Sequence, residues 1–243
     1  MSYQGKKILT IIPARAGSKR VVNKNVRKLG GKSLVERAME LAISLSDLID
    51  KTVLSSDGDA ILNEAKNFPE ILALKRPEGI SGDKAPAITY VQHALHEVEK
   101  NGDHYDIVVI LQPSSPFTLA EDVRGTIEQL DFANGVEASV SVMESDHAYH
   151  PMKLKRLQNK RLISYLEDEK GQTMAHELPV LYVRNGSVYV AGRNLVNKGI
   201  VISDESNAYV MPRERSIDIN DELDFKFAEF MYSNYFNAVN DGK

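Results

Sequence analysis

Short apolar runs alternate with amphipathic stretches along the first half of the chain. The runs at 7–12 and 106–111 are nearly unbroken, which is typical of strands buried on both faces of a parallel sheet. Further strands are expected at residues 51–55 and 71–74. Between these runs, helices are expected at residues 34–45, 60–67 and 89–100. The alternation predicts βαβ units and an α/β fold with helices on both faces of the sheet.

Local signals mark two features more closely. Ser33 is followed by Glu36 three residues on, which is the spacing of a capping box at a helix start. After about Ser145 the pattern changes, because residues 153–157 and 162–166 alternate apolar with polar side chains on either side of a Gln-Asn-Lys turn. That pattern indicates an exposed hairpin or arm. A strand at 187–191 and a closing helix at about 221–236 complete the prediction.

Composition narrows the class of protein. The chain has 243 residues, of which 42% are apolar and 26% charged, as in ordinary globular domains. There is no cysteine, so disulfides and thiolate metal sites are excluded. No basic start precedes a long apolar stretch, and no run approaches the ~20 apolar residues of a membrane span. We therefore expect a cytoplasmic protein that does not enter a membrane.

The net charge of −4 argues against bulk binding of nucleic acid. An anionic ligand would then need a local basic cluster, and one follows the first strand. The segment Pro-Ala-Arg-Ala-Gly-Ser-Lys-Arg is followed by Asn-Lys-Asn and supplies the cations Arg15, Lys19, Arg20, Lys24 and Arg27. Ligands of open α/β sheets bind beyond the carboxyl ends of the strands, where amides and cations suit a phosphate chain. The segment is neither a P-loop nor a dinucleotide fingerprint. The alternative is a solvated basic loop.

A possible metal site lies near the end of the chain, in Ser-Ile-Asp-Ile-Asn. On a strand, Asp218 and Asn220 point the same way. Carboxylate and amide oxygens suit Mg²⁺, with phosphate oxygens and waters completing an octahedron. Alternatively, Asn220 is the N-cap of the closing helix.

These motifs together resemble the N-acylneuraminate cytidylyltransferases, which make CMP-sialic acid. The resemblance runs from Ile8 to about Phe230. It rests on Ala-Arg-x-x-Ser-Lys with Lys-Asn in the first loop, on Leu-Gln-Pro-Ser-Ser-Pro at 111–116, on Asn-Gly at 185–186, and on Ser-Ile-Asp-Ile-Asn. It implies one Rossmann-like nucleotidyltransferase domain over residues 1–243. A mostly parallel sheet would carry a small protruding dimerisation arm at about 145–178.

The resemblance also implies roles for individual residues. Arg15, Lys24 and Asp218 are the expected catalytic residues, and Asp218 and Asn220 the expected ligands of Mg²⁺. Arg76 is expected to donate to a carbonyl of the base. The full nucleotide-binding set is Ala14, Arg15, Gly17, Ser18, Lys24, Asn25 and Arg76. The sugar-binding set is Gln112, Ser115, Lys153, Tyr182 and Asn185.

The implied reaction transfers CMP from CTP to a nine-carbon 2-keto acid sugar, with Mg²⁺ and in a homodimer. Three departures bear on the acceptor. Phe117-Thr118 stands where the family often has Leu-Arg, Ala175-His176 where it often has Arg-Gln, and Asn220 where it has Asp. The expected acceptor is therefore N-acetylneuraminate or a relative such as legionaminate or pseudaminate.

Three other functions compete with this interpretation. Cytidylyltransferases for 3-deoxy-manno-octulosonate carry Gln-Gly-Asp-Glu-Pro where this chain has Gln-Pro-Ser-Ser-Pro. A glycosyltransferase could use Asp57 and Asp59 as an Asp-x-Asp metal site, although acidic residues are common in a first helical turn. The third is a nucleotide-binding protein without catalysis. The pairs His93/His96 and His147/His150 lack the further ligands of a zinc site.

Overall fold

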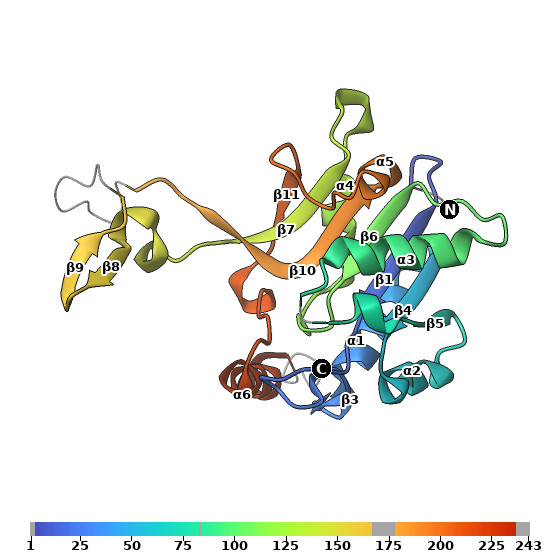
Figure 1. The fold of residues 1–243 in the computed structure, drawn as a ribbon, viewed down its shortest axis with the longest axis horizontal. Helices are drawn as coiled ribbons and strands as arrows, with labels where there is room; N and C mark the ends of the chain where they lie inside the picture. Colours follow the sequence, from blue (N-terminus) through green and yellow to red (C-terminus); the bar gives the residue numbers. More distant parts are fainter. Residues whose placement is uncertain (1–2, 83, 167–177, 237–243) are drawn as a thin grey trace.

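The computed structural model describes residues 3–82, 84–166 and 178–236. A seven-stranded sheet in the order β11-β7-β10-β6-β1-β4-β5 forms its centre (Figure 1). The strands are β1 (Ile8–Pro13), β4 (Lys51–Ser56), β5 (Ile71–Lys75), β6 (Ile107–Leu111), β7 (Ala138–Glu144), β10 (Tyr182–Gly192) and β11 (Asn207–Val210). β10 runs antiparallel to both of its neighbours, whereas the other pairings are parallel. The predicted α/β fold with a mostly parallel sheet is confirmed.

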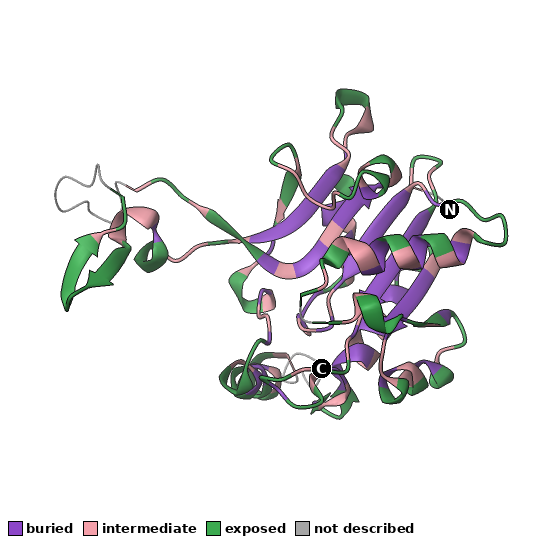
Figure 2. Ribbon diagram, in the orientation of Figure 1, coloured by how far each residue is buried: buried purple, intermediate pink, exposed green. Residues whose placement is uncertain are grey.

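Helices cover both faces of the sheet. They are α1 (Leu34–Ile43), α2 (Asp59–Glu64), α3 (Ala87–Glu99), α4 (Ala120–Glu128) and α5 (Arg193–Asn197). The last helix, α6 (Glu222–Met231), lies away from the sheet and packs in a separate apolar cluster with Leu34 and Phe117 (Figure 1). Along β1, Ile8 and Ile12 pack on the side of α1, α2 and α4, while Leu9 and Ile11 pack on the side of α3 and α5. Successive side chains of a strand face opposite ways, so a sheet covered on both faces needs this unbroken apolar run. Figure 2 shows the burial concentrated in these strands.

Caps define the first and last helices. The capping box of Ser33 and Glu36 is present at the start of α1, as predicted. The alternative role for Asn220 is wrong, because Asp221 is the N-cap of α6. Its Oδ1 accepts from the amides of Leu223 and Asp224. A π-helical turn (Tyr232–Phe236) continues α6. The short turns are Lys24–Val26, Ala65–Asn67, Glu78–Ile80, Phe132–Asn134, His147–Tyr149, Pro151–Lys153 and Arg213–Arg215.

Two hairpins lie outside the main sheet. β2 (Lys28–Leu29) and β3 (Lys32–Ser33) form a small one directly before α1. β8 (Lys155–Gln158) and β9 (Arg161–Ser164) form the predicted exposed hairpin, which turns through Asn159 and Lys160 at positive φ.

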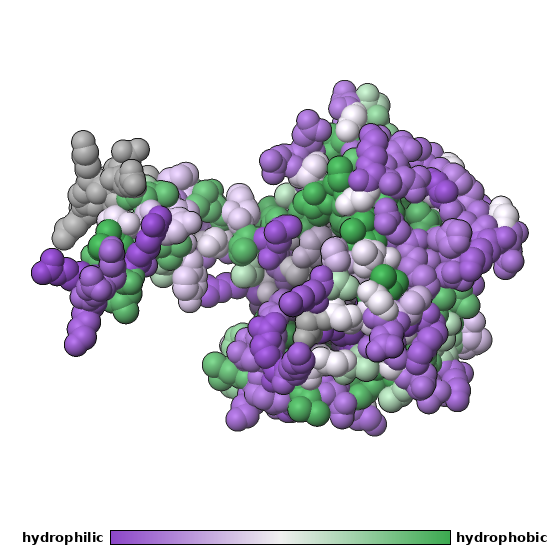
Figure 3. Space-filling model, in the orientation of Figure 1, coloured by the Kyte–Doolittle hydropathy of each residue, from purple (hydrophilic) through white to green (hydrophobic). Residues whose placement is uncertain are grey.

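The β8–β9 hairpin stands away from the body on an extended neck, formed by the end of β7 and the start of β10 (Figure 1). Its side chains are mostly exposed, Leu157 and Leu162 by about three quarters. Apolar groups therefore lie open among polar ones on the arm (Figure 3). Residues 167–177 of the predicted arm fall outside the described residues. None of the described helices has the length and apolar character that crossing a membrane requires.

Candidate active site

A cavity of about 350 Å³ lies beyond the carboxyl ends of β1, β5 and β6. The segments that follow these strands carry the predicted polar residues, so the parallel sheet brings distant parts of the sequence to one place. Its lining includes Arg15, Ser18, Lys24, Asn25, Arg76 and Gln112. Most of the predicted nucleotide-binding residues and one predicted sugar-binding residue thus share one cavity.

A second cavity of about 350 Å³ adjoins the first and shares Arg15, Ser18 and Lys24 with it. Its remaining lining includes two further cations, Lys19 and Arg20. Several cations around one concave surface provide charge-assisted donors for a chain of phosphates. The basic segment therefore encloses two hollows rather than forming only a solvated face.

The loop that carries Arg15 is held in shape by two side chains. Asn25 is buried and donates from Nδ2 to the carbonyl of Arg15. Asp57 Oδ1 accepts from the amide of Ala16 at 2.8 Å. Asp59, the other acid of the Asp-x-Asp motif, forms a surface ion pair with Lys75. Asp57 is thus used to hold the basic loop and Asp59 is a surface residue, which counts against the glycosyltransferase alternative.

Two predicted loop residues do not line either cavity. Ala14 is fully buried in the core, and its amide donates to the carbonyl of Ser55. A β-carbon added to Gly17 would have no atom within 4 Å. Steric crowding therefore does not require glycine at position 17.

Lys24 connects the basic loop to the segment that carries Asp218. Its Nζ donates to the carbonyl of Ile219 at 2.7 Å. Burial lowers the pKa of Lys24, and the charge of Arg15 acts in the same direction, while Asp218 opposes them. The ammonium group therefore lies within electrostatic reach of both a predicted phosphate ligand and the predicted metal ligand.

Arg76 also lines the first cavity. Its side chain is buried, with Nε donating to Ser55 Oγ at 3.2 Å and Nη2 to the Ser55 carbonyl at 2.9 Å. The guanidinium stacks over the Tyr90 ring at 4.6 Å, and burial lowers the pKa of Arg76. These contacts hold a planar donor group at the cavity wall. Its role toward a base stays a prediction.

Tyr90 was missed by the sequence interpretation. It lies on α3 and lines the cavity beside Arg76 and Gln112. Burial raises the pKa of Tyr90 to about 12, against the effect of its hydrogen bond with Gln112. Tyr90 thus contacts one residue predicted for the nucleotide and one predicted for the sugar. Its place beside Val91 on an apolar helix face gave no sign of this role.

Asp218 and Asn220 face each other, with Asn220 Nδ2 donating to Asp218 Oδ2 at 2.8 Å. The Asp218 carboxylate also approaches Gly186, where a β-carbon would lie 3.1 Å from Oδ2 and where φ is +77°. The tight bend at Gly186 therefore makes room for the carboxylate. Asp218 additionally lines a cavity of about 450 Å³ with Met143, Phe227 and Met231, among other residues.

The donor chemistry here fits Mg²⁺. Within the part of the chain that the structure describes, no three His, Asp or Glu side chains gather in a way that could hold a metal. Mg²⁺, however, commonly takes one or two protein carboxylates and completes its shell with substrate phosphates and water. Asp218 supplies such a carboxylate, and its hydrogen-bond partner Asn220 lines the second basic cavity. Asn220 turns its NH₂ group toward Asp218, so its oxygen would serve as a ligand only with the amide turned over.

The predicted sugar-binding residues divide into three groups. Gln112 lines the first cavity. Ser115 and Asn185 are buried, and Ser115 Oγ has no hydrogen-bond partner among the described residues. Asn185 forms hydrogen bonds with Ser141 of β7 and with Ser216, so it connects β7 to the segment before Asp218. Lys153 lies just before β8 on the arm, and Tyr182 on the neck, and neither lines the cavity. One chain alone thus does not bring the predicted sugar ligands together.

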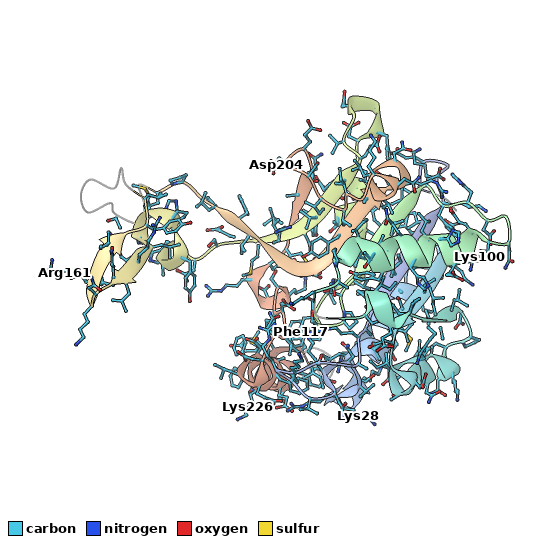
Figure 4. All side chains as sticks on the ribbon, in the orientation of Figure 1. Lys28, Lys100, Phe117, Arg161, Asp204 and Lys226 are labelled. Atoms are coloured by element: carbon cyan, nitrogen blue, oxygen red, sulfur yellow. The ribbon has the colours of Figure 1, made fainter. Side chains whose placement is uncertain are left out.

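The departures at Phe117 and Thr118 affect packing in this chain. Phe117, labelled in Figure 4, is buried and stacks on Phe236 with ring centroids 4.2 Å apart. Thr118 bonds to Ser187 through their hydroxyl groups. Both residues therefore attach the segment after β6 to neighbouring elements, Phe117 to the turn after α6 and Thr118 to β10. The departure at Ala175 lies outside the described residues.

Comparison with known proteins decides the family. The model of the family described as cytidylyltransferase matches residues 9–195. The chain belongs to the cytidylyltransferase family. Two solved structures share the fold of this cytidylyltransferase. They are a CMP:2-keto-3-deoxy-manno-octonic acid synthetase complexed with CTP (TM-score 0.66, 14% identity, 93% of this chain and 98% of the other) and a 4-diphosphocytidyl-2C-methyl-D-erythritol synthase from Anaerococcus prevotii (TM-score 0.64, 15% identity, 95% and 98%).

Sequence similarity to curated relatives covers nearly all of this cytidylyltransferase. An N-acylneuraminate cytidylyltransferase of Escherichia coli is 28% identical over 97% of the chain, which spans 57% of that relative's length. A pseudaminic acid cytidylyltransferase of Campylobacter jejuni is 28% identical, covering 93% of this chain and 96% of the relative. A CMP-N,N'-diacetyllegionaminic acid synthase of Legionella pneumophila is also 28% identical, over 92% and 95%. The predicted resemblance is confirmed.

Proposed function

We propose that this cytidylyltransferase transfers CMP from CTP to a nine-carbon 2-keto acid sugar, either N-acetylneuraminate or a relative such as legionaminate or pseudaminate. The observation that carries the proposal is the cavity at the carboxyl ends of β1, β5 and β6. It unites Arg15 and Lys24 with Arg76 and Gln112. The names of three relatives, each 28% identical, support the class of acceptor. We place the reaction in the cytoplasm, where CTP is available.

In this reaction a hydroxyl of the sugar attacks the α-phosphorus of CTP and releases its proton to solvent. The bond from that phosphorus to the bridging oxygen of the β-phosphate breaks, and pyrophosphate leaves. Arg15 and Lys24 stabilise the charge that develops on the leaving group. Gln112, fixed by Tyr90, orients the acceptor against the nucleotide. Asp218 would hold Mg²⁺, which when bound neutralises phosphate charge and lowers the pKa of the attacking hydroxyl.

The direct test is pyrophosphate release from CTP and Mg²⁺ with each acceptor offered in turn. We expect release with one nine-carbon acid and little with 3-deoxy-manno-octulosonate. Matched reactions without sugar, and with UTP or ATP in place of CTP, provide the controls. Release only with the eight-carbon acid would overturn the proposed acceptor. No release with any acid, from folded protein that binds CTP, would overturn the transferase activity itself.

We further propose a homodimer in which each arm covers the neighbour's active site. Two observations support it: the arm exposes Leu157 and Leu162, and Lys153 and Tyr182 lie on the arm and neck, outside their own chain's cavity. We expect sedimentation to show a dimer at micromolar concentration. Replacing Leu157 and Leu162 together with aspartate should produce monomers, because two charges would have to be buried in the interface. Lys160→Ala, at the turn of the same hairpin, should remain dimeric. A wild-type monomer would contradict the proposal.

A further inference from the structure

A buried ion pair joins the start of α4 to the segment just before Asp218. Asp122 is fully buried and is the third residue of α4. Its Oδ1 accepts from Arg215 Nη2 at 2.8 Å, and its Oδ2 accepts from Arg215 Nε at 3.0 Å. The Leu119 amide also donates to Oδ2, as part of the helix cap. This two-point contact fixes both the distance and the plane of the guanidinium.

The ion pair joins two segments of the candidate site, the one that carries Asp218 and the one that follows Gln112. Arg215 precedes Asp218 by three residues, and Asp122 lies in the first turn of the helix that follows the segment containing Gln112. The same two segments meet again where the Ile219 amide donates to the Ser114 carbonyl at 2.9 Å. Asp218 therefore lies between two connections to one partner segment. Arg215 Nη2 also pairs with the more exposed Glu121 at 2.7 Å, and Ile219 packs in one apolar cluster with Phe117. The contact with Asp122 is the buried, two-point part of this connection.

We propose that Arg215 is a positioning residue that, through Asp122, holds Asp218 within electrostatic reach of Lys24 at the edge of the basic cavities. This inference rests on the proposed function, because it assigns Asp218 the role of metal ligand. Neither Arg215 nor Asp122 lines the cavity, so the pair acts through Asp218 and not by contact with the nucleotide. Hydrogen bonding to Asp122 raises the pKa of Arg215, so the contact favours the charged guanidinium.

The choice of arginine makes the idea testable by a conservative change. Lysine keeps the charge but cannot reproduce a planar two-point contact. In Arg215→Lys the segment before Asp218 should lose its fixed direction while the charge balance around Asp122 is retained. Arg124→Lys is the matched control, because Arg124 lies on α4, the helix of Asp122, and pairs with Asp47 at the surface.

The experiment measures kcat, the KM for CTP, and the Mg²⁺ concentration that gives half-maximal rate. For Arg215→Lys we expect kcat to fall about 10- to 100-fold, as for a misplacement of about 1 Å. The half-maximal Mg²⁺ concentration should rise about 10-fold or more, as when a partner that orients a metal ligand is lost. The KM for CTP should change less than about two-fold, since base and phosphate contacts remain. Arg124→Lys should match the wild type.

A second measurement separates this inference from the activity itself. Binding of Mn²⁺ to the enzyme with CTP, followed by electron paramagnetic resonance, needs no turnover. Mn²⁺ should bind Arg215→Lys about 10-fold or more weakly than wild type. Equal Mn²⁺ affinity, with a lowered Tm but unchanged kcat per folded molecule, would make the ion pair purely structural and overturn the inference. If wild type binds Mn²⁺ but releases no pyrophosphate, the proposed function fails while the Mn²⁺ comparison still decides the role of Arg215.

Discussion

Asp218→Asn is expected to lower kcat about 100- to 1000-fold, which is about 3–4 kcal/mol of transition-state stabilisation. The reason is electrostatic. Because the family's second aspartate is Asn220 in this chain, the predicted pair of metal ligands carries one carboxylate, which faces Asn220 at 2.8 Å. Asparagine has nearly the same shape and can still accept that hydrogen bond, so the fold should persist while the charge is lost. Steady-state kinetics at saturating CTP and increasing Mg²⁺ would measure the effect.

The neighbouring acid provides a matched control for this prediction. Asp221 caps α6 through its side chain, and asparagine is an equally good N-cap. Asp221→Asn removes one negative charge from the same segment, so kcat should stay within about two-fold of wild type while helix capping persists. Equal losses in both variants would indicate a general effect of charge. Full activity in Asp218→Asn would show that any essential metal is held elsewhere.

Features set by local sequence could be predicted well. Ile8 and Ile12 pack on one side of β1 and Leu9 and Ile11 on the other. A short, β-branched apolar run of this kind favours a strand covered on both faces. The capping box at Ser33 is likewise formed by residues three apart. The location of the site also follows from the sequence, since the carboxyl ends of parallel strands lie at one edge.

Features set by contacts between distant residues could not be predicted. Asp122 and Arg215 are 93 residues apart, and the sequence around either residue does not indicate its partner. Asn25 has the chemistry of a ligand contact, but the structure uses its amide to hold the Arg15 carbonyl. Asp221, and not Asn220, is the helix cap, while the Asn220 amide is directed to Asp218. In each case several roles suited the residue type, and tertiary packing selected one.

Lys24→Met is expected to lower kcat about 100-fold or more, because it removes a cation that would neutralise the leaving pyrophosphate. Its hydrogen bond to the Ile219 carbonyl would be lost as well, so an effect on the position of Asp218 adds to the loss of charge. Lys24→Arg keeps the charge and separates the two causes. Lys28→Met, at an exposed lysine labelled in Figure 4, should leave kcat unchanged.

The pH dependence provides a sharper test of Lys24 than the loss of rate. Burial lowers the pKa of Lys24, so in the free enzyme its charge is lost at a lower pH than that of an exposed lysine. If the charged form binds phosphate, kcat/KM must decline as pH rises through this lowered pKa. In Lys24→Arg the decline should move to higher pH, because a guanidinium stays protonated. If the decline of kcat/KM at high pH is unchanged in Lys24→Arg, another group causes the decline. Lys24 would then act through its contact with Ile219 and not through its charge.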